Sequence, residues 1–201
     1  VMLDAKITQI NTDSQKNDFD FGDVVLERCV SYFRGLHFTA ILEFMDVPVL
    51  NKFFVANQCG NKMFMTLMLK KYNVPTPKTY FSFSSESALE NIEKIGYPLV
   101  IKPVIGSWGR GVMQIKDKDT ADALFEIRDI TDSPHDRIFY LQEVVNRPPR
   151  DIRVITIGDE PIAAMYRKSS GGFKTNIALG ADPELCEITK EIEEISTKAS
   201  K

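Results

Sequence analysis

A glycine-rich segment, GSWGRG at 106–111, is the part of the sequence whose residue types point most directly to chemistry. It follows an apolar run that ends in Lys102. Glycines let a backbone approach an anion closely and adopt positive φ. Ser107, Arg110 and the free amides supply hydrogen-bond donors to phosphate oxygens. The segment therefore predicts a phosphate-binding loop, although a plain glycine-rich hairpin turn would give the same short pattern.

Two common phosphate-binding motifs do not fit this loop. No Gly-Lys-Ser/Thr follows at the spacing of a Walker loop. Residues 112–116 favour a strand, whereas a dinucleotide-binding motif would open a helix at that place. The sequence thus favours a flap between two strands over either alternative.

Several charged residues elsewhere in the sequence are suited to work with such a loop, and each also has an ordinary structural interpretation. Lys62 fits a solvated lysine at the start of a helix. Arg153 and Arg167 fit exposed residues of a hairpin, and Glu143 fits a surface charge. Only their combination with the loop points to a binding site.

The elements that must position these residues change in character along the chain. Strands at 23–27 and 47–51, with a helix at 32–44 between them, predict a parallel pair with a crossover. A strand at 5–10 precedes this unit without an earlier partner, so we expect the chain to be trimmed at its N-terminus. From residue 61 the pattern becomes that of an antiparallel α+β fold. The expected elements there are helices at 61–72, 119–130 and 185–198, a serine-capped helix ending at Gly96, and strands at 78–83, 98–104, 112–116, 138–142, 152–157 and 161–167.

Composition limits the classes of partner. The 201 residues are 43% hydrophobic and 26% charged with a formal net charge of -3, which gives no reason to expect nucleic acid. Cys29, Cys59 and Cys186 are far apart in sequence, so we interpret them as reduced thiols in or near the core rather than as metal ligands. No apolar run approaches the ~18 residues that cross a membrane, and no export signal opens the chain, so the cytoplasm is the expected compartment.

Taken together, the motifs resemble the RimK-like ATP-grasp ligases of the LysX/ArgX family. The similar stretch runs from 47 to 180 and includes CGNK at 59–62, IKPVIGSWGRGV at 101–112, QEVV at 142–145, PRDIRV at 149–154, IAAMYR at 162–167 and KTN at 174–176. The resemblance implies an α/β (α+β) chain with an ATP-grasp fold that follows part of a parallel pre-ATP-grasp domain. The implied divisions are 1–55 for that domain, 56–141 for the central region with the loop, and 142–201 for an incomplete C-terminal subdomain.

The resemblance also implies roles for individual residues. Lys62 and Lys102 would meet the phosphates of ATP, Glu143 with the neighbouring backbone would recognise adenine, and Asp151 would line the ribose and phosphate side. Arg153, Arg167 and Asn176 would be catalytic, facing the reacting carboxylate and the γ-phosphate. The implied cofactor-binding set is Lys62, Lys102, Gly106, Ser107, Trp108, Gly109, Arg110, Gly111, Val112, Gln142, Glu143, Val144, Val145, Asp151, Arg153, Arg167 and Asn176, with Trp108 included as a member of the loop that has no chemical role of its own.

The implied reaction is ATP-dependent formation of an amide bond through an acyl phosphate, with Mg²⁺ bridging the β- and γ-phosphates. In this family it joins the amino group of 2-aminoadipate or glutamate to the C-terminal glutamate of the small acidic carrier protein LysW, in lysine or arginine biosynthesis. A RimK-like glutamate ligase acting on a protein or peptide tail is one alternative, and a non-catalytic nucleotide-binding module is another. The family also implies a homo-oligomer, commonly a tetramer, and the composition gives no reason to expect a membrane or nucleic-acid partner.

Two departures from the family pattern stand out. The RimK type usually carries Arg-Gly-Gly where this chain has Leu179-Gly180-Ala181, so one positive charge expected near the substrate is missing. The family's magnesium ligands, an acidic residue and a Glu-x-Asn pair, would lie beyond residue 201. Glu184, Glu187 and Glu191 do not match them and fit a solvated helix face, so no metal ligand is assigned within the chain.

Overall fold

The computed structural model describes residues 4–5, 21–131, 133–169, 173–177 and 180–201. The chain divides into two compact units, Val1–Asn61 and Lys62–Lys201. Apart from Ala5, the strand expected at 5–10 lies outside the described residues. The finer division of the second unit near residue 142 stays a prediction.

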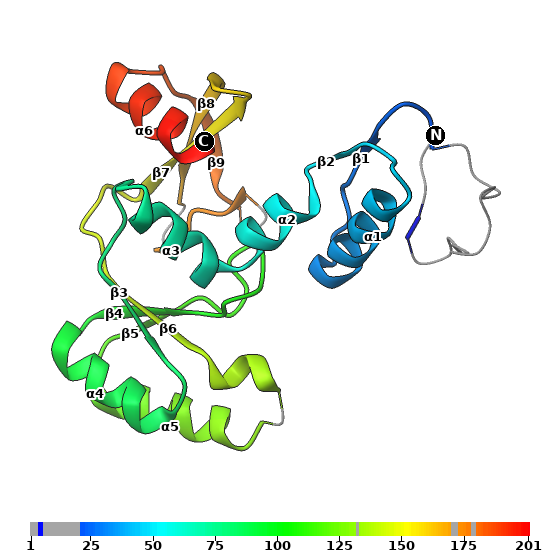
Figure 1. Cartoon of the computed structure of the whole chain (residues 1–201). Coiled ribbons are helices and arrows are strands. Elements are labelled where there is room, and N and C mark those ends of the chain that lie inside the picture. The colour runs from blue at the N-terminus through cyan, green and yellow to red at the C-terminus, as the bar shows by residue number, and fades with distance from the viewer. Residues whose placement is uncertain (1–3, 6–20, 132, 170–172, 178–179) are drawn as a thin grey trace. The chain divides into compact units, whose positions relative to one another are not determined.

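The described residues of the first unit form a small parallel sheet and two helices (Figure 1). Strand β1 (Val25–Leu26) pairs in parallel with β2 (Val49–Leu50), and α1 (Tyr32–Phe44) connects them. This confirms the predicted strand–helix–strand unit, with shorter strands than expected. Helix α2 (Phe53–Gly60) was not predicted, and it spans the expected division between residues 55 and 56.

The second unit is built around a four-stranded antiparallel sheet that we call the central sheet. Its order is β3 (Thr79–Ser82), β6 (Phe139–Glu143), β4 (Leu99–Lys102) and β5 (Met113–Ile115). Helix α4 (Ser85–Ile95) and helix α5 (Lys118–Asp129) lie on the same side of this sheet (Figure 1). The short helix η1 (Pro134–Arg137) leads into β6.

Strand alternation divides the central sheet into an apolar face and a polar face. Leu99, Ile101, Phe139 and Leu141 are fully buried in a core with residues of α4 and α5, including Phe125. The residues between them in β4 and β6 point to the opposite face, where Val100 pairs with Gln142 and Lys102 pairs with Tyr140. The core thus fixes which side chains are presented on the polar face.

The helices that frame the central sheet begin where their sequences predict. Ser84 caps α4 by accepting a hydrogen bond from the Ser87 amide, and Asp117 caps α5 in the same way through Thr120. Helix α3 (Lys62–Lys71) precedes the sheet and places Lys62 at its first turn. Gly96, with a φ of 82°, ends α4 as expected.

A second, three-stranded antiparallel sheet follows, with the order β7 (Arg150–Ile157), β8 (Glu160–Lys168) and β9 (Asp182–Leu185). Helix α6 (Lys190–Ser200) packs against β7 and β8. The prediction of a helix over 185–198 was wrong at its start, because Leu185 pairs with Met165 in the sheet and the helix begins only after its cap, Thr189.

The three cysteines are free. Cys186 is buried and Cys29 is partly buried, but Cys59 is exposed, so its expected place in or near the core was wrong. Among the described residues, no helix is long and apolar enough to span a bilayer.

Candidate functional site

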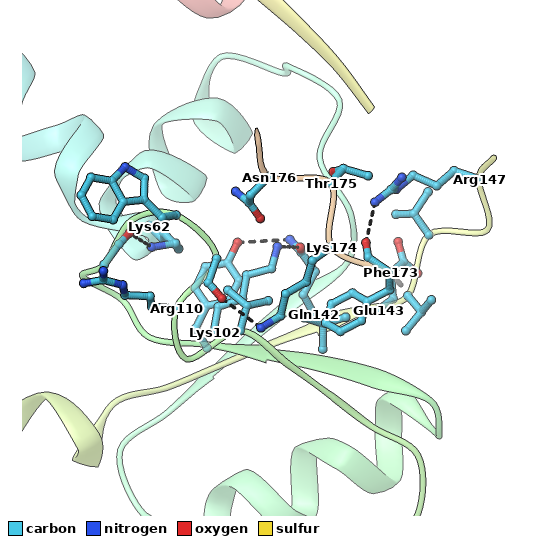
Figure 2. A pocket seen from close by; sticks show the side chains of 18 of the residues that line it. Lys62, Lys102, Arg110, Gln142, Glu143, Arg147, Phe173, Lys174, Thr175 and Asn176 are labelled. Atoms are coloured by element: carbon cyan, nitrogen blue, oxygen red, sulfur yellow. Dashed lines mark hydrogen bonds between the residues drawn. The ribbon is translucent and has the colours of Figure 1, made fainter. Parts of the chain in front are cut away.

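A cavity of about 960 Å³ lies within the second unit, over the polar face of the central sheet. Side chains from β4 and β6 form part of its wall, and the N-terminus of α3, the glycine loop at 106–112 and the segments 143–149 and 173–176 supply the rest (Figure 2). Segments separated by more than a hundred residues therefore meet around one space.

Lys62 and Lys102 both line this cavity. The Lys62 amide donates to the Val104 carbonyl oxygen at 2.8 Å, which joins the start of α3 to the end of β4, and its Nζ donates to the Gly106 carbonyl oxygen at 2.7 Å. Burial lowers the pKa of both ammonium groups, and the charge of Lys62 lowers the pKa of Lys102 further. Both charged ammonium groups are therefore unfavourably buried in the cavity. An anion there would stabilise them by neutralising two poorly hydrated charges.

A chain of hydrogen bonds beneath Lys102 fixes its position. Lys102 Nζ donates to Gln142 Oε1, and Gln142 Nε2 donates to the hydroxyl oxygens of Thr79 at 2.9 Å and Tyr140 at 3.1 Å. The Tyr140 hydroxyl also shares a hydrogen bond of 2.8 Å with Thr66 of α3. Because Gln142 has both its acceptor and its donor engaged, it holds the ammonium group of Lys102 in a defined place.

The glycine loop has a backbone that few other residues would allow. Gly106, Gly109 and Gly111 have φ values of 150°, 73° and 67°, and a side chain at Gly111 would come within 3.2 Å of Pro103. Trp108 also has a positive φ of 58° and is 44% exposed. The guanidinium of Arg110 lies 4.8 Å from the centre of its ring.

The segment after β6 is tied down by Glu143 and Arg147. Glu143 and Lys78 exchange two hydrogen bonds, from the Lys78 amide to the Glu143 carboxylate at 2.7 Å and from the Glu143 amide to the Lys78 carbonyl at 3.0 Å. Arg147 donates to the carbonyl oxygens of Arg150 and, at 2.9 Å, of Phe173. The carboxylate of Glu143 thus fixes the end of the sheet as well as lining the cavity.

Asp151 and Arg167 form the most complete ion pair among the described residues. They face each other across β7 and β8, and two donors of the guanidinium lie 2.7 Å from the two carboxylate oxygens. The hydroxyl of the buried Thr175 donates to the same carboxylate. Burial alone would raise the pKa of Asp151, but the hydrogen bonds from Arg167 and Thr175 lower it overall.

The structure brings most of the predicted site residues to the cavity and leaves four outside its lining. Gly111, Asp151, Arg153 and Arg167 do not line it, although Asp151 reaches it indirectly through Thr175. The predicted residues in the lining are Lys62, Lys102, Gly106, Ser107, Trp108, Gly109, Arg110, Val112, Gln142, Glu143, Val144, Val145 and Asn176.

Sequence reasoning missed five polar residues among those that the structure describes in the lining: Tyr140, Asn146, Arg147, Lys174 and Thr175. Two signals were available. Tyr140 alternates with the buried Phe139 and Leu141 and so had to face the other side of the sheet. Lys174 and Thr175 stand beside Asn176 in the run KTN, which was noted without a role for its first two members.

The electrostatics of the lining favour an anion. Among the described residues of the lining, the basic ones are Lys62, Lys102, Arg110, Arg147 and Lys174, and the only acidic one is Glu143. A cavity with this excess of positive charge and a glycine loop at its rim is suited to a polyphosphate. Within the described part of the chain, no group of three or more His, Cys, Asp or Glu side chains is arranged to hold a metal ion.

Comparison with known families agrees with this geometry. Residues 59–201 match the model of the RimK-like ATP-grasp domain, and residues 1–58 match that of the LysX preATP-grasp domain. The chain belongs to the RimK-like ATP-grasp family. The RimK-like match covers the whole cavity, and the boundary between the two matches falls close to the division between the compact units.

Individual relatives point to the same family. Over 185 residues the chain is 39% identical to alpha-aminoadipate–LysW ligase LysX of Saccharolobus solfataricus, covering 90% of this chain and 67% of that protein. It is 34% identical over 179 residues to glutamate–LysW ligase ArgX of Sulfolobus acidocaldarius, covering 89% and 64%. The chain therefore spans about two thirds of the length of these curated relatives.

A solved structure supports the ATP-grasp fold. The RimK domain protein from Sphaerobacter thermophilus superposes with a TM-score of 0.69 at 19% identity, covering 88% of this chain and 62% of that one. At this identity the likeness concerns the fold alone, and it confirms the expected fold class.

Proposed function

We propose that this RimK-like ATP-grasp protein is an ATP-dependent ligase that joins the amino group of 2-aminoadipate or glutamate to the C-terminal glutamate of a LysW-like carrier protein. The observation that carries the proposal is the convergence of Lys62 and Lys102 on one cavity beneath a glycine loop. The LysX and ArgX relatives supply the substrate class, since their names specify LysW and these two amino acids.

The cavity fits the phosphates of ATP. Burial disfavours the charged forms of Lys62 and Lys102, and phosphate oxygens would stabilise both charges. The loop residues Ser107 and Arg110 add donors at the rim. ATP supplies the phosphoryl group that activates a carboxylate, and the protein's part is to bind and orient the phosphates and exclude water.

The other end of the cavity fits a purine. Val144 and Val145 line it beside Glu143, whose carboxylate is held by the Lys78 amide. A fixed strand end with apolar side chains and backbone donors and acceptors is the kind of surface that recognises a nucleobase. The expected adenine contacts of Glu143, Val144 and Val145 are part of this proposal.

The catalytic roles of Arg153, Arg167 and Asn176 stay predictions. Asn176 lines the cavity, which supports a role next to bound substrate. Arg167 already donates two hydrogen bonds to Asp151, so in this state its charge is largely neutralised within the protein. Arg153 lies at an exposed position of β7, opposite Met165, and does not line the cavity.

The proposal includes Mg²⁺ bound to the phosphates of the nucleotide. The described residues contain no group of three or more His, Cys, Asp or Glu side chains that could hold a divalent cation. A complex of Mg²⁺ with the nucleotide phosphates stays a prediction from the family. Location in the cytoplasm and assembly into a homo-oligomer such as a tetramer stay predictions as well.

The test is release of inorganic phosphate from ATP in the presence of Mg²⁺, a LysW-like carrier and either amino acid. We expect release only when carrier and amino acid are both present, together with a mass increase of the carrier by one residue. Release with 2-aminoadipate but not glutamate would assign the LysX-like substrate, and the reverse the ArgX-like one. ATP binding without release for any acceptor would contradict the ligase proposal and favour a nucleotide-binding module.

A further inference from the structure

The glycine loop is held from two sides by lysine ammonium groups, and the function proposed above uses only one of them. Lys62 Nζ donates to the carbonyl oxygen of Gly106 at 2.7 Å. Lys174 Nζ donates to the carbonyl oxygen of Gly109 at 3.1 Å, from a segment 65 residues further along the chain (Figure 2). Gly109 lies at the middle of the loop, so this hydrogen bond reaches the loop far from its two ends.

The backbone on either side of Lys174 is held in place by hydrogen bonds. The next residue, Thr175, is 5% exposed and donates to the carboxylate of Asp151, which is itself paired with Arg167. On the other side, the carbonyl oxygen of Phe173 accepts a hydrogen bond of 2.9 Å from Arg147. The backbone on both sides of Lys174 is thus anchored to β7 and to the segment after β6.

The loop, by contrast, depends on such contacts. Its glycines at positive φ give the backbone wide freedom, and Ser107, Trp108 and Arg110 are exposed. A charge-assisted hydrogen bond from an anchored side chain limits that freedom. It also offsets the partial negative charge of the Gly109 carbonyl, which would otherwise weaken the field that attracts phosphate.

We propose that Lys174 is a positioning residue that clasps the glycine loop over the cavity through the Gly109 carbonyl oxygen. The clasp exists without a ligand, and its effect on nucleotide affinity rests on the proposed function. Because Lys174 already holds the loop in place, the loop loses less conformational entropy when a polyphosphate binds.

Trp108 provides a reporter for this contact, since it is the single tryptophan of the chain and lies in the loop beside Gly109. In the ligand-free protein, Lys174→Met is expected to raise the acrylamide quenching constant of Trp108 roughly 1.5- to 2-fold, because a local contact that limits opening is lost. Lys174→Arg keeps a charged donor and should restore the value of the unmodified protein. A general loss of structure would not be rescued in this way.

A matched control is Lys198→Met. Lys198 Nζ also donates to a backbone carbonyl oxygen, that of Asn73 at 3.0 Å, but it is not part of the cavity. Its loss should leave Trp108 quenching unchanged. Equal quenching in Lys174→Met and the unmodified protein, or a rise that Lys174→Arg does not reverse, would overturn the clasp.

Titration with ADP separates the clasp from the proposed function. With both correct, Lys174→Met should weaken ADP binding roughly tenfold, the loss expected for one charge-assisted hydrogen bond. A rise in quenching with no ADP binding by any variant would support the clasp and contradict the nucleotide site. Normal ADP binding with unchanged quenching would support the nucleotide site and overturn the clasp.

Discussion

The two sheets of the second unit differ in how they fix their polar side chains. In the central sheet, β4 and β6 are buried along nearly their whole length, and the alternation that buries Leu141 presents Gln142 on the cavity side. In the three-stranded sheet, Ile152, Ile157 and Leu185 are exposed, and the charged residues pair with one another instead. A side chain is placed by packing in the first sheet and by its ionic partner in the second.

Truncation of one apolar residue in each sheet gives the largest expected difference. Leu141→Ala, at a fully buried position of β6, should destabilise the second unit by about 2–5 kcal/mol, because it leaves a cavity in the core. Ile157→Ala, at an exposed position of β7, should change stability by less than about 0.5 kcal/mol. Urea unfolding followed by Trp108 fluorescence reports on this unit, and similar losses for both variants would break the comparison.

Replacement of a cavity lysine tests whether the central sheet carries the binding function. Lys102→Met should weaken ADP binding about 100-fold or more, because it removes a fixed positive charge facing the phosphates and leaves Gln142 without its partner. Lys116→Met removes an exposed lysine just after β5 and should leave binding unchanged. Calorimetric titration provides the measurement, and unchanged affinity in Lys102→Met would remove the basis of the proposed function.

The central sheet is also where the sequence was most informative. Its strands and flanking helices were predicted close to their observed bounds, because buried apolar runs, the serine cap of α4 and Gly96 give strong local signals. The cavity-facing positions of Lys102 and Gln142 follow from the same alternation. Here short-range patterns and tertiary packing require the same arrangement.

The three-stranded sheet was less predictable for a physical reason. The spacing of Leu185, Ile188 and Ile192 is typical of one face of a helix. In the structure, however, Leu185 pairs with Met165 and belongs to β9. Likewise, Arg167 was expected to face substrate, and nothing in its neighbours in sequence reveals that Asp151 lies opposite it across the hairpin. Cross-strand partners depend on register, which local periodicity does not specify.

The ion pair between Asp151 and Arg167 tests whether pairing really fixes the second sheet. Asp151→Asn should destabilise the second unit by about 1–3 kcal/mol, because it leaves a half-buried guanidinium without its counter-charge. Glu184→Gln, which breaks the more exposed pair with Lys168, should have an effect below about 0.5 kcal/mol.

The pH dependence of stability gives an independent measure of the same pair. The pKa of Asp151 is lowered in the folded protein, so its contribution is present above the ordinary value of 3.8 and is lost as the pH falls through the folded pKa. Asp151→Asn should therefore lose less stability than the unmodified protein on acidification. Parallel acid-unfolding curves for the two proteins would contradict a stabilising pair.

The smallest expected effect concerns proton uptake by the cavity lysines. Burial lowers the pKa of Lys62 and Lys102 below 10.5, so in alkaline solution the free protein has lost part of their charge, and a bound phosphate raises both pKa values again. ADP affinity should therefore fall as the pH rises through the alkaline range. Calorimetry in buffers of different ionisation enthalpy should show proton uptake on ADP binding, and this uptake should be larger in alkaline solution than near neutral pH. The phosphates of ADP do not titrate in this window, since a terminal phosphate has its last pKa near ~6. Proton release, or an affinity that rises with pH, would mean that the two ammonium groups do not meet the phosphates.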